Sequence, residues 1–86
     1  KENYSTREKL ALRKFAKRIA ERREELGMSQ PELERKARFT KTMISQYENG
    51  YRVPSYLNLR QLAKALNVSA DYLLCLDTVE PEDSEP

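Results

Sequence analysis

Several residue types that carry catalytic or cross-linking chemistry are scarce or missing in this 86-residue chain. It contains no His and no Trp, a single cysteine (Cys75) and only two Gly. Without His there is no imidazole to act as a general base, and one Cys can form neither a zinc cluster nor an internal disulfide. We therefore expect no enzyme and no metal or other cofactor. A reducing compartment, the cytoplasm, fits the lone thiol.

Long apolar runs and leader segments are missing as well. No stretch approaches the roughly 18 consecutive apolar residues of a membrane span. The opening KENYSTREK lacks the apolar core of a signal peptide. The chain also lacks an initiator Met, so we expect it to be processed or cut from a longer protein. Its length allows one small domain with a modest core, as does its apolar content of 38%.

Charge is distributed unevenly, although the net charge of the whole chain is only +2. All 16 Lys and Arg and nine of the 14 acids precede residue 77, so residues 1–76 carry a net charge of +7. Residues 77–86 hold five acids and no base, a net charge of −5. A basic body with an acidic tail fits a polyanionic partner, but the solvated faces of ordinary helices give the same totals.

Capping residues predict five helices and no strand. Capping boxes begin the first two helices, Ser5 with Glu8 and Ser29 with Glu32. The expected N-caps of the other three are Thr40, Ser55 and Ser69. Gly27, Gly50 and Asn67 are the expected left-handed stops. The helices should then span about 6–26, 30–37, 41–49, 56–66 and 70–76.

The apolar spacing within these helices predicts one core and thus a compact all-α domain. Apolar residues at helical spacing form a stripe along the first helix and another along the fourth. Phe39 is expected to fill the space at the connection between the second and third helices. Cys75, flanked by leucines, is expected to be a buried small hydrophobe. The other expected core residues are Leu12, Phe15, Ile19, Leu26, Leu33, Ala37, Ile44, Tyr47, Leu59, Leu62, Ala63 and Leu66.

The third helix should present an outward face of unusual composition. The second and third helices are joined by three or four residues and cross steeply, so each must bury one face against the core. Once the buried residues are identified, the helical repeat determines which residues point outward. The outward residues are Lys41, Thr42, Ser45, Gln46 and Asn49, one cation and four hydrogen-bonding groups with no acid. Because solvated helix faces usually include Glu, this face is suited to a groove that carries hydrogen-bond donors and acceptors.

These residues carry a family resemblance. The stretch SQPELERKARFTKTMISQYENG, followed by LRQLAKALNVS and DYLL, resembles the Cro/C1-type (XRE) helix-turn-helix family of bacterial and phage repressors. The resemblance covers about residues 15–74, and the fourth and fifth helices match as well as the motif does. It implies a lambda-repressor-like five-helix fold, with the helix-turn-helix at helices two and three. It also implies a double-stranded DNA operator as the partner.

The resemblance also implies roles for individual residues. The base-reading residues would be Lys41, Thr42, Ser45 and Gln46, with Lys41 donating to guanine and Gln46 pairing with adenine. The residues that contact phosphates would be Gln30, Thr40, Asn49, Tyr51 and Arg52. Two of these have simpler interpretations, because Asn49 could only stop the helix and Arg52 could only be a solvated loop charge. Glu48 would form a structural ion pair with Arg23 rather than contact DNA.

Two positions depart from the family pattern. The family prefers a small residue where Glu34 stands and often a glycine where Arg38 stands. Glu34 requires either a slightly wider helix crossing or an outward-bent side chain that pairs with Arg38. Arg38 would be strained by about 1–2 kcal/mol if its φ is positive.

The expected organisation and function follow from these observations. Residues 1–14 form an N-terminal extension and the start of the first helix. Residues 15–76 form the DNA-binding domain, and residues 77–86 an acidic disordered tail or a linker to a missing C-terminal domain. We expect a sequence-specific transcriptional repressor that binds a palindromic operator as a homodimer. The alternatives are the antitoxin of a toxin–antitoxin pair and a protein-interaction module on the same fold that does not bind DNA.

Overall fold

The computed structural model describes residues 4–76, which form five helices and no strand. The predicted all-α fold is confirmed, whereas the acidic tail and the first three residues of the extension lie outside the described residues. Within residues 4–76 no helix is both long and apolar enough to cross a membrane. The helices are α1 (Thr6–Glu25), α2 (Gln30–Ala37), α3 (Met43–Glu48), α4 (Tyr56–Leu66) and α5 (Ala70–Leu73).

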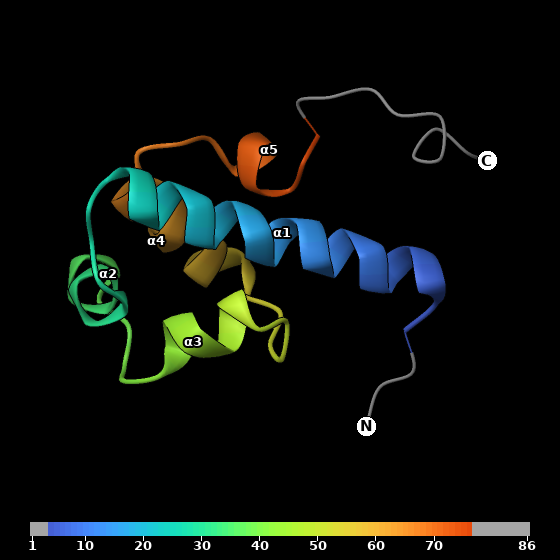
Figure 1. Cartoon of the computed structure of the whole chain (residues 1–86), viewed down its shortest axis with the longest axis horizontal. Coiled ribbons are helices and arrows are strands. Elements are labelled where there is room, and N and C mark those ends of the chain that lie inside the picture. Colours follow the sequence, from blue (N-terminus) through green and yellow to red (C-terminus); the bar gives the residue numbers. More distant parts are fainter. Residues whose placement is uncertain (1–3, 77–86) are drawn as a thin grey trace.

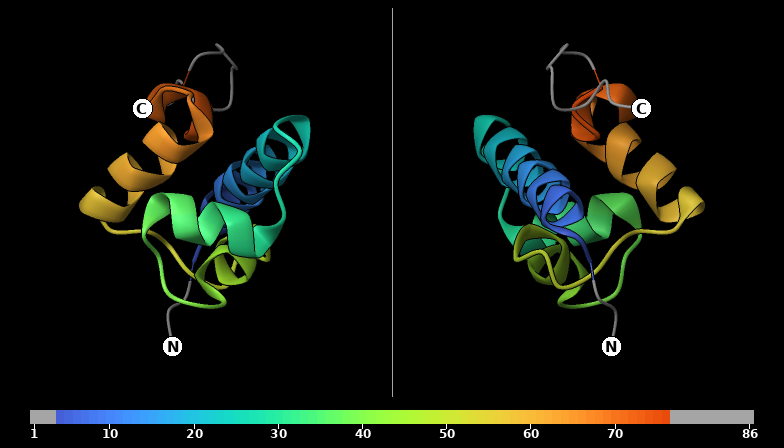
Figure 2. Two further views of the ribbon diagram at one scale, coloured as in Figure 1. Left: turned by 90° about the vertical axis from the view of Figure 1, so that its left-hand side faces the viewer. Right: turned by 90° about the vertical axis from the view of Figure 1, so that its right-hand side faces the viewer.

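The long helix α1 is the centre of the arrangement (Figure 1). Helix α3 lies on one side of α1 and α5 on the other, below and above it in Figure 1, and both views of Figure 2 agree. Helix α2 packs against α3 and α4, and α4 also contacts α1 and α5. The α2–α3 pair is therefore held against the rest of the bundle, on the side away from α5.

All five helices contribute to one core. Tyr47, Ile19 and Leu33 are completely buried, and the predicted stripe residues Leu12 and Leu59 pack against the core while partly exposed. Leu26 was wrongly predicted, because α1 ends at Glu25 and Leu26 is 37% exposed at its C-cap. Four further residues belong to the core although their spacing did not predict it, namely Ala16, Met43, Ala65 and Leu73.

The helix starts follow the predicted capping residues in four of five cases. Both capping boxes are present, with the backbone N–H of Ser29 donating to Glu32 Oε1 at 2.7 Å and that of Ser5 donating to Glu8 Oε1 at 2.8 Å. The hydroxyls of Ser55 and Ser69 each accept a hydrogen bond from a backbone N–H in the first turn of the next helix. These caps work through neighbours in sequence, which is why the sequence reveals them.

The bounds of α3 and α5 differ from the prediction. Thr40 is not the N-cap of α3, since Thr42 takes a left-handed φ of 70° and the helix begins only at Met43. Helix α5 ends at Leu73 because Cys75 also takes a left-handed φ, of 60°. The N–H of Leu76 then closes the end of α5 by donating to the carbonyl of Asp71 at 2.8 Å. Cys75 is half-buried rather than buried.

Two arginines of α1 hold the ends of other helices. Arg18 Nη1 donates to the carbonyl of Tyr72 at 2.7 Å, and its guanidinium lies 4.4 Å from the centre of the Tyr72 ring. Arg22 Nε donates to the carbonyl of Leu66, the last residue of α4, at 3.0 Å. Carbonyls at helix C-termini lack intrahelical partners and favour cations. These contacts fix α4 and α5 on α1.

Candidate nucleic-acid interface

The connection between α2 and α3 comprises residues 38–42 and is longer than predicted. It contains two left-handed residues that are not glycine, Arg38 with a φ of 62° and Thr42 with a φ of 70°. Between them, the Phe39 ring packs edge-on against the Tyr47 ring, with centroids 5.8 Å apart. Phe39 thus anchors the connection to the core as predicted, while Arg38 carries the expected backbone strain.

The structure excludes one of the two arrangements expected for Glu34, the outward-bent side chain. Its side chain is not bent outward toward Arg38 but is buried, with 7% exposed, and faces α3. Glu34 Oε2 accepts a hydrogen bond from the backbone N–H of Ile44 at 3.2 Å. The physical reason is that Thr42 provides no side-chain cap, so the first turn of α3 has N–H groups that need an acceptor.

An ion pair neutralises the single acid of α3. Arg23 Nε lies 2.7 Å from Glu48 Oε2, and Arg23 Nη2 lies 3.1 Å from Glu48 Oε1. Arg23 Nη1 also donates to the carbonyl of Met28 at 2.9 Å, which links α1 to the start of α2. The hydrogen bonds to Glu48 raise the pKa of the Arg23 guanidinium, against the opposing effect of burial. Both side chains are almost buried, at 13% and 8% exposed.

Gln30 is part of the same network. Its Nε2 donates to Glu48 Oε1 at 2.9 Å, which connects the first residue of α2 to the last residue of α3. A primary amide carries two N–H groups, so this contact leaves Gln30 a second donor. The network therefore fixes the position of Gln30 without using all its hydrogen-bonding capacity.

Of the residues predicted to point outward from the third helix, only Ser45 and Gln46 lie on α3, because Lys41 and Thr42 belong to the connection and Asn49 is the C-cap. Lys41, Thr42 and Asn49 are exposed, and Ser45 and Gln46 are half-buried. Two pairs of candidate residues are in contact: Asn49 Nδ2 donates to Ser45 Oγ at 3.3 Å, and Arg52 Nη1 donates to Gln46 Oε1 at 3.0 Å. The remaining candidates, Thr40 and Tyr51, are also exposed.

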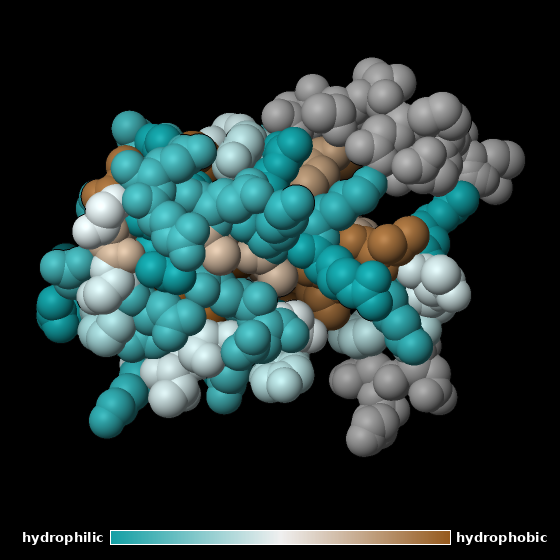
Figure 3. Space-filling model, in the orientation of Figure 1, coloured by the Kyte–Doolittle hydropathy of each residue, from teal (hydrophilic) through white to brown (hydrophobic). Residues whose placement is uncertain are grey.

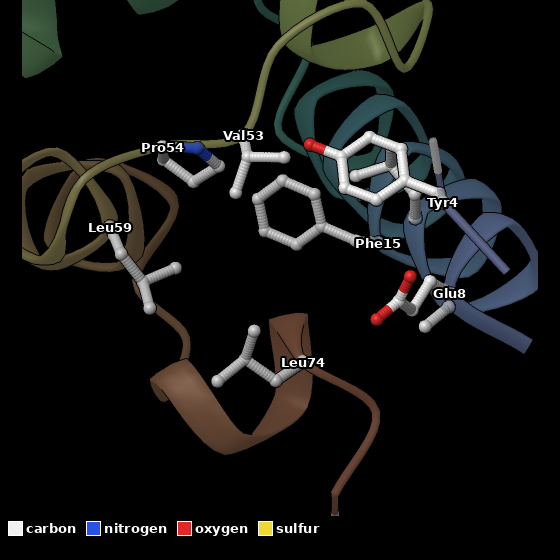
Figure 4. A pocket seen from close by; sticks show the side chains of 9 residues that line it. Tyr4, Glu8, Phe15, Val53, Pro54, Leu59 and Leu74 are labelled. Atoms are coloured by element: carbon white, nitrogen blue, oxygen red, sulfur yellow. The ribbon is translucent and has the colours of Figure 1, made fainter. Parts of the chain in front are cut away.

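An apolar pocket of about 290 Å³ lies between α1, the loop after α3 and the end of α5. Val53 and Pro54 form the loop side of the pocket, and the Phe15 ring points into it from α1 (Figure 4). Leu59 and Leu74 face it from α4 and from the end of α5. Hydrogen bonds join the loop to α3, because the backbone N–H of Tyr51 donates to the carbonyl of Gln46 at 2.9 Å and Arg52 donates to the Gln46 side chain.

The arrangement of α2, the connection and α3 is that of a helix-turn-helix. A helix-turn-helix family model matches residues 19–73. The chain is 37% identical over 69 residues to the HTH-type transcriptional regulator ImmR of Bacillus subtilis, an alignment that covers 80% of this chain and 54% of that protein. It is 36% identical over 68 residues to the uncharacterized HTH-type transcriptional regulator y4dJ of Sinorhizobium fredii, covering 79% and 82%.

These similarities establish the family. The chain belongs to the XRE-family helix-turn-helix proteins, which confirms the resemblance seen in the sequence. It is a DNA-binding domain of the kind found in transcription regulators, and it spans about half the length of the ImmR relative.

Proposed function

We propose that this protein is a sequence-specific transcriptional repressor that binds a palindromic operator as a dimer, with α3 in the major groove. The observation that carries the proposal is the surface at α3, where Lys41 of the connection is exposed and Ser45 and Gln46 of α3 are half-buried. The only acid of α3, Glu48, is paired with Arg23 and almost buried. By occupying its operator, the dimer would block access of the polymerase.

The base-reading residues would be Lys41, Thr42, Ser45 and Gln46. Lys41 would donate to the O6 and N7 atoms of guanine, and the Thr42 methyl would contact a thymine methyl. Gln46 would pair with adenine, donating to N7 and accepting from N6. The hydrogen bond from Arg52 to Gln46 Oε1 is compatible with this pairing, because an amide oxygen has two lone pairs and accepts both bonds.

The phosphate contacts would surround these residues. Gln30 lies at the start of α2, where backbone N–H groups also favour a phosphate, and its second amide N–H is directed by the bond to Glu48. Asn49, Tyr51 and Arg52 would hold the backbone at the other end of α3, while Thr40 would do so from the connection. Contacts of this kind position the protein on the duplex without reading its sequence.

Exposed apolar side chains support the proposed dimer. Tyr56 and Leu57, in the first turn of α4, are 72% and 65% exposed, and Leu76 after α5 is 65% exposed. In Figure 3 most of the visible face is hydrophilic, and the larger apolar patch lies on the right, over the first turns of α1. Dimers of helix-turn-helix domains place their reading helices about 34 Å apart, one turn of DNA.

The proposal is tested by selecting binding sites from a random pool of duplex DNA. The winning site is then titrated against scrambled DNA at two salt concentrations. We expect the selected site to be palindromic and to be bound far more tightly than scrambled DNA. If no sequence is enriched and binding is weak and salt-sensitive, sequence-specific binding is ruled out and the alternative of a protein-interaction module is favoured.

A further inference from the structure

We propose that Glu34 sets the orientation of α3 and thereby which bases the protein reads. Glu34 is a positioning residue, which acts on DNA through the helix that it holds. The inference rests on the proposed base reading by Lys41, Thr42, Ser45 and Gln46. It adds a residue outside that face, on α2, as a determinant of specificity.

Helix α3 begins without a cap of its own. Thr42, at the N-cap position, has a left-handed φ of 70° and its side chain makes no capping hydrogen bond. Ile44 is completely buried, so its backbone N–H has no access to water and requires an acceptor within the protein. Glu34 Oε2, at 3.2 Å, is that acceptor. The cap of α3 therefore comes from a neighbouring helix, ten positions earlier in the chain.

The same residue also holds the other end of the connection. The main-chain carbonyl of Glu34 accepts a hydrogen bond from the N–H of Phe39 at 2.8 Å. The backbone carbonyl of Glu34 therefore holds the start of the connection, and its side-chain carboxylate holds the start of α3. Since Lys41 and Thr42 lie between these two contacts, Glu34 determines how they are presented relative to α3.

The hydrogen bond from the Ile44 N–H to Glu34 is strong enough to determine the orientation of a helix as short as α3. Helix α3 has six residues, too few to be stable without tertiary contacts. A hydrogen bond to a carboxylate is stronger than one between neutral groups, and the side chain of Glu34 is largely shielded from water. The small residue that the family resemblance implies at this position would have no acceptor to offer. The base preference of this protein should therefore differ from that of relatives with a small residue there.

The test compares variants that keep or remove the acceptor. Glu34→Gln keeps an oxygen of the same reach, Glu34→Asp keeps the charge on a side chain too short to reach Ile44, and Glu34→Ala removes the group. Glu21→Ala, at an exposed glutamate of α1, is the matched control. For each variant we would measure thermal unfolding, hydrogen exchange of the Ile44 amide, and the base preference in the random-pool selection.

We expect Glu34→Gln and Glu21→Ala to retain both the slow exchange of the Ile44 amide and the parent base preference. Glu34→Ala should unfold cooperatively but exchange this amide faster. Its discrimination between bases next to α3 should fall about tenfold. Binding to scrambled DNA should change less than about twofold, since phosphate contacts do not read sequence. A merely structural role would leave the base preference of the folded variant unchanged.

A folded Glu34→Ala protein with the parent base preference would overturn the proposal. If Glu34→Ala does not fold, Glu34→Asp takes its place, and parent-like base preference in that variant has the same consequence. If the parent selects no sequence, the proposed function fails, and so does the specificity role of Glu34. The Ile44 exchange rates then show separately whether Glu34 still holds α3.

Discussion

Gln46 and Arg52 are in contact, yet at the residue scale they would perform different tasks. Gln46 lies on α3 and has an amide, the group that pairs with adenine. Arg52 lies in the loop, is exposed, and has a charge that suits a phosphate. Separate substitutions should distinguish base reading from backbone binding.

Gln46→Ala should lose discrimination at one base pair of the operator, by about 1–3 kcal/mol, while nonspecific affinity is retained. The loss arises because the amide pairs with one base edge only. Titrating the selected site and its single-base variants with both proteins measures this. An equal loss of affinity on every sequence would contradict the base-reading role.

Arg52→Ala should weaken binding to all sequences alike and lower the slope of log K against log salt by about one unit. One phosphate contact fewer means about one counterion fewer released. Salt titrations of the parent and the variant provide the measurement, with Arg60→Ala on α4 as the control for loss of an exposed arginine. An unchanged slope would make Arg52 only a solvated loop charge.

At the scale of elements, the helix-turn-helix contains strain in its connection. Arg38→Gly should stabilise the protein by about 1 kcal/mol, because glycine adopts the left-handed conformation without strain, which outweighs its larger loss of entropy on folding. The matched control is Arg35→Gly, an exposed position inside α2, which should destabilise by about 1 kcal/mol. Urea unfolding measures both. Equal destabilisation by the two substitutions would show that Arg38 is not strained.

The Arg23–Glu48 pair joins α1 to α3 and should show energetic coupling. Either Arg23→Met or Glu48→Met should cost about 3 kcal/mol, because each leaves an almost buried charge without its partner. The double variant should cost less than the sum of the single variants. A double-mutant cycle in urea measures the coupling, and strictly additive costs would show that the pair does not stabilise the position of α3.

At the scale of the whole molecule, the proposed dimer should depend on exposed apolar side chains away from the core. Leu57→Glu should weaken binding to the palindromic site about tenfold while leaving the melting temperature and the affinity for a single half-site nearly unchanged. The reason is that Leu57 is 65% exposed and contributes little to the monomer fold. Leu26→Glu, exposed at the end of α1, is the control.

The molar mass in solution, measured together with the DNA titration, tests this prediction. A Leu57→Glu protein with parent-like mass and parent-like affinity for the palindrome would exclude this surface from the dimer. The apolar residues after α5 would then be the next surface to test.

Most of the helices and the outward face could be predicted because their signals are local. The caps at Ser29 and Ser55 act within three residues, and the apolar spacing of Leu33, Ala37, Ile44 and Tyr47 selects the inward face of α2 and α3. That choice by itself directs Ser45 and Gln46, the two candidates on α3, outward. By contrast, the positive φ at Thr42 has no such signal, and so the predicted start of α3 was wrong.

The sequence by itself determined the helical fold class, through capping residues and apolar spacing, and the family, through its resemblance to known helix-turn-helix proteins. It also determined the composition of the face that we propose reads DNA. Only the tertiary structure decided what holds that face in place. Glu34 caps α3 across ten positions, and Arg22 holds the end of α4 across 44. Such contacts join helices that are distant in sequence, so the spacing of residues along the chain does not predict them. Their geometry depends on where packing of the core brings the helices together.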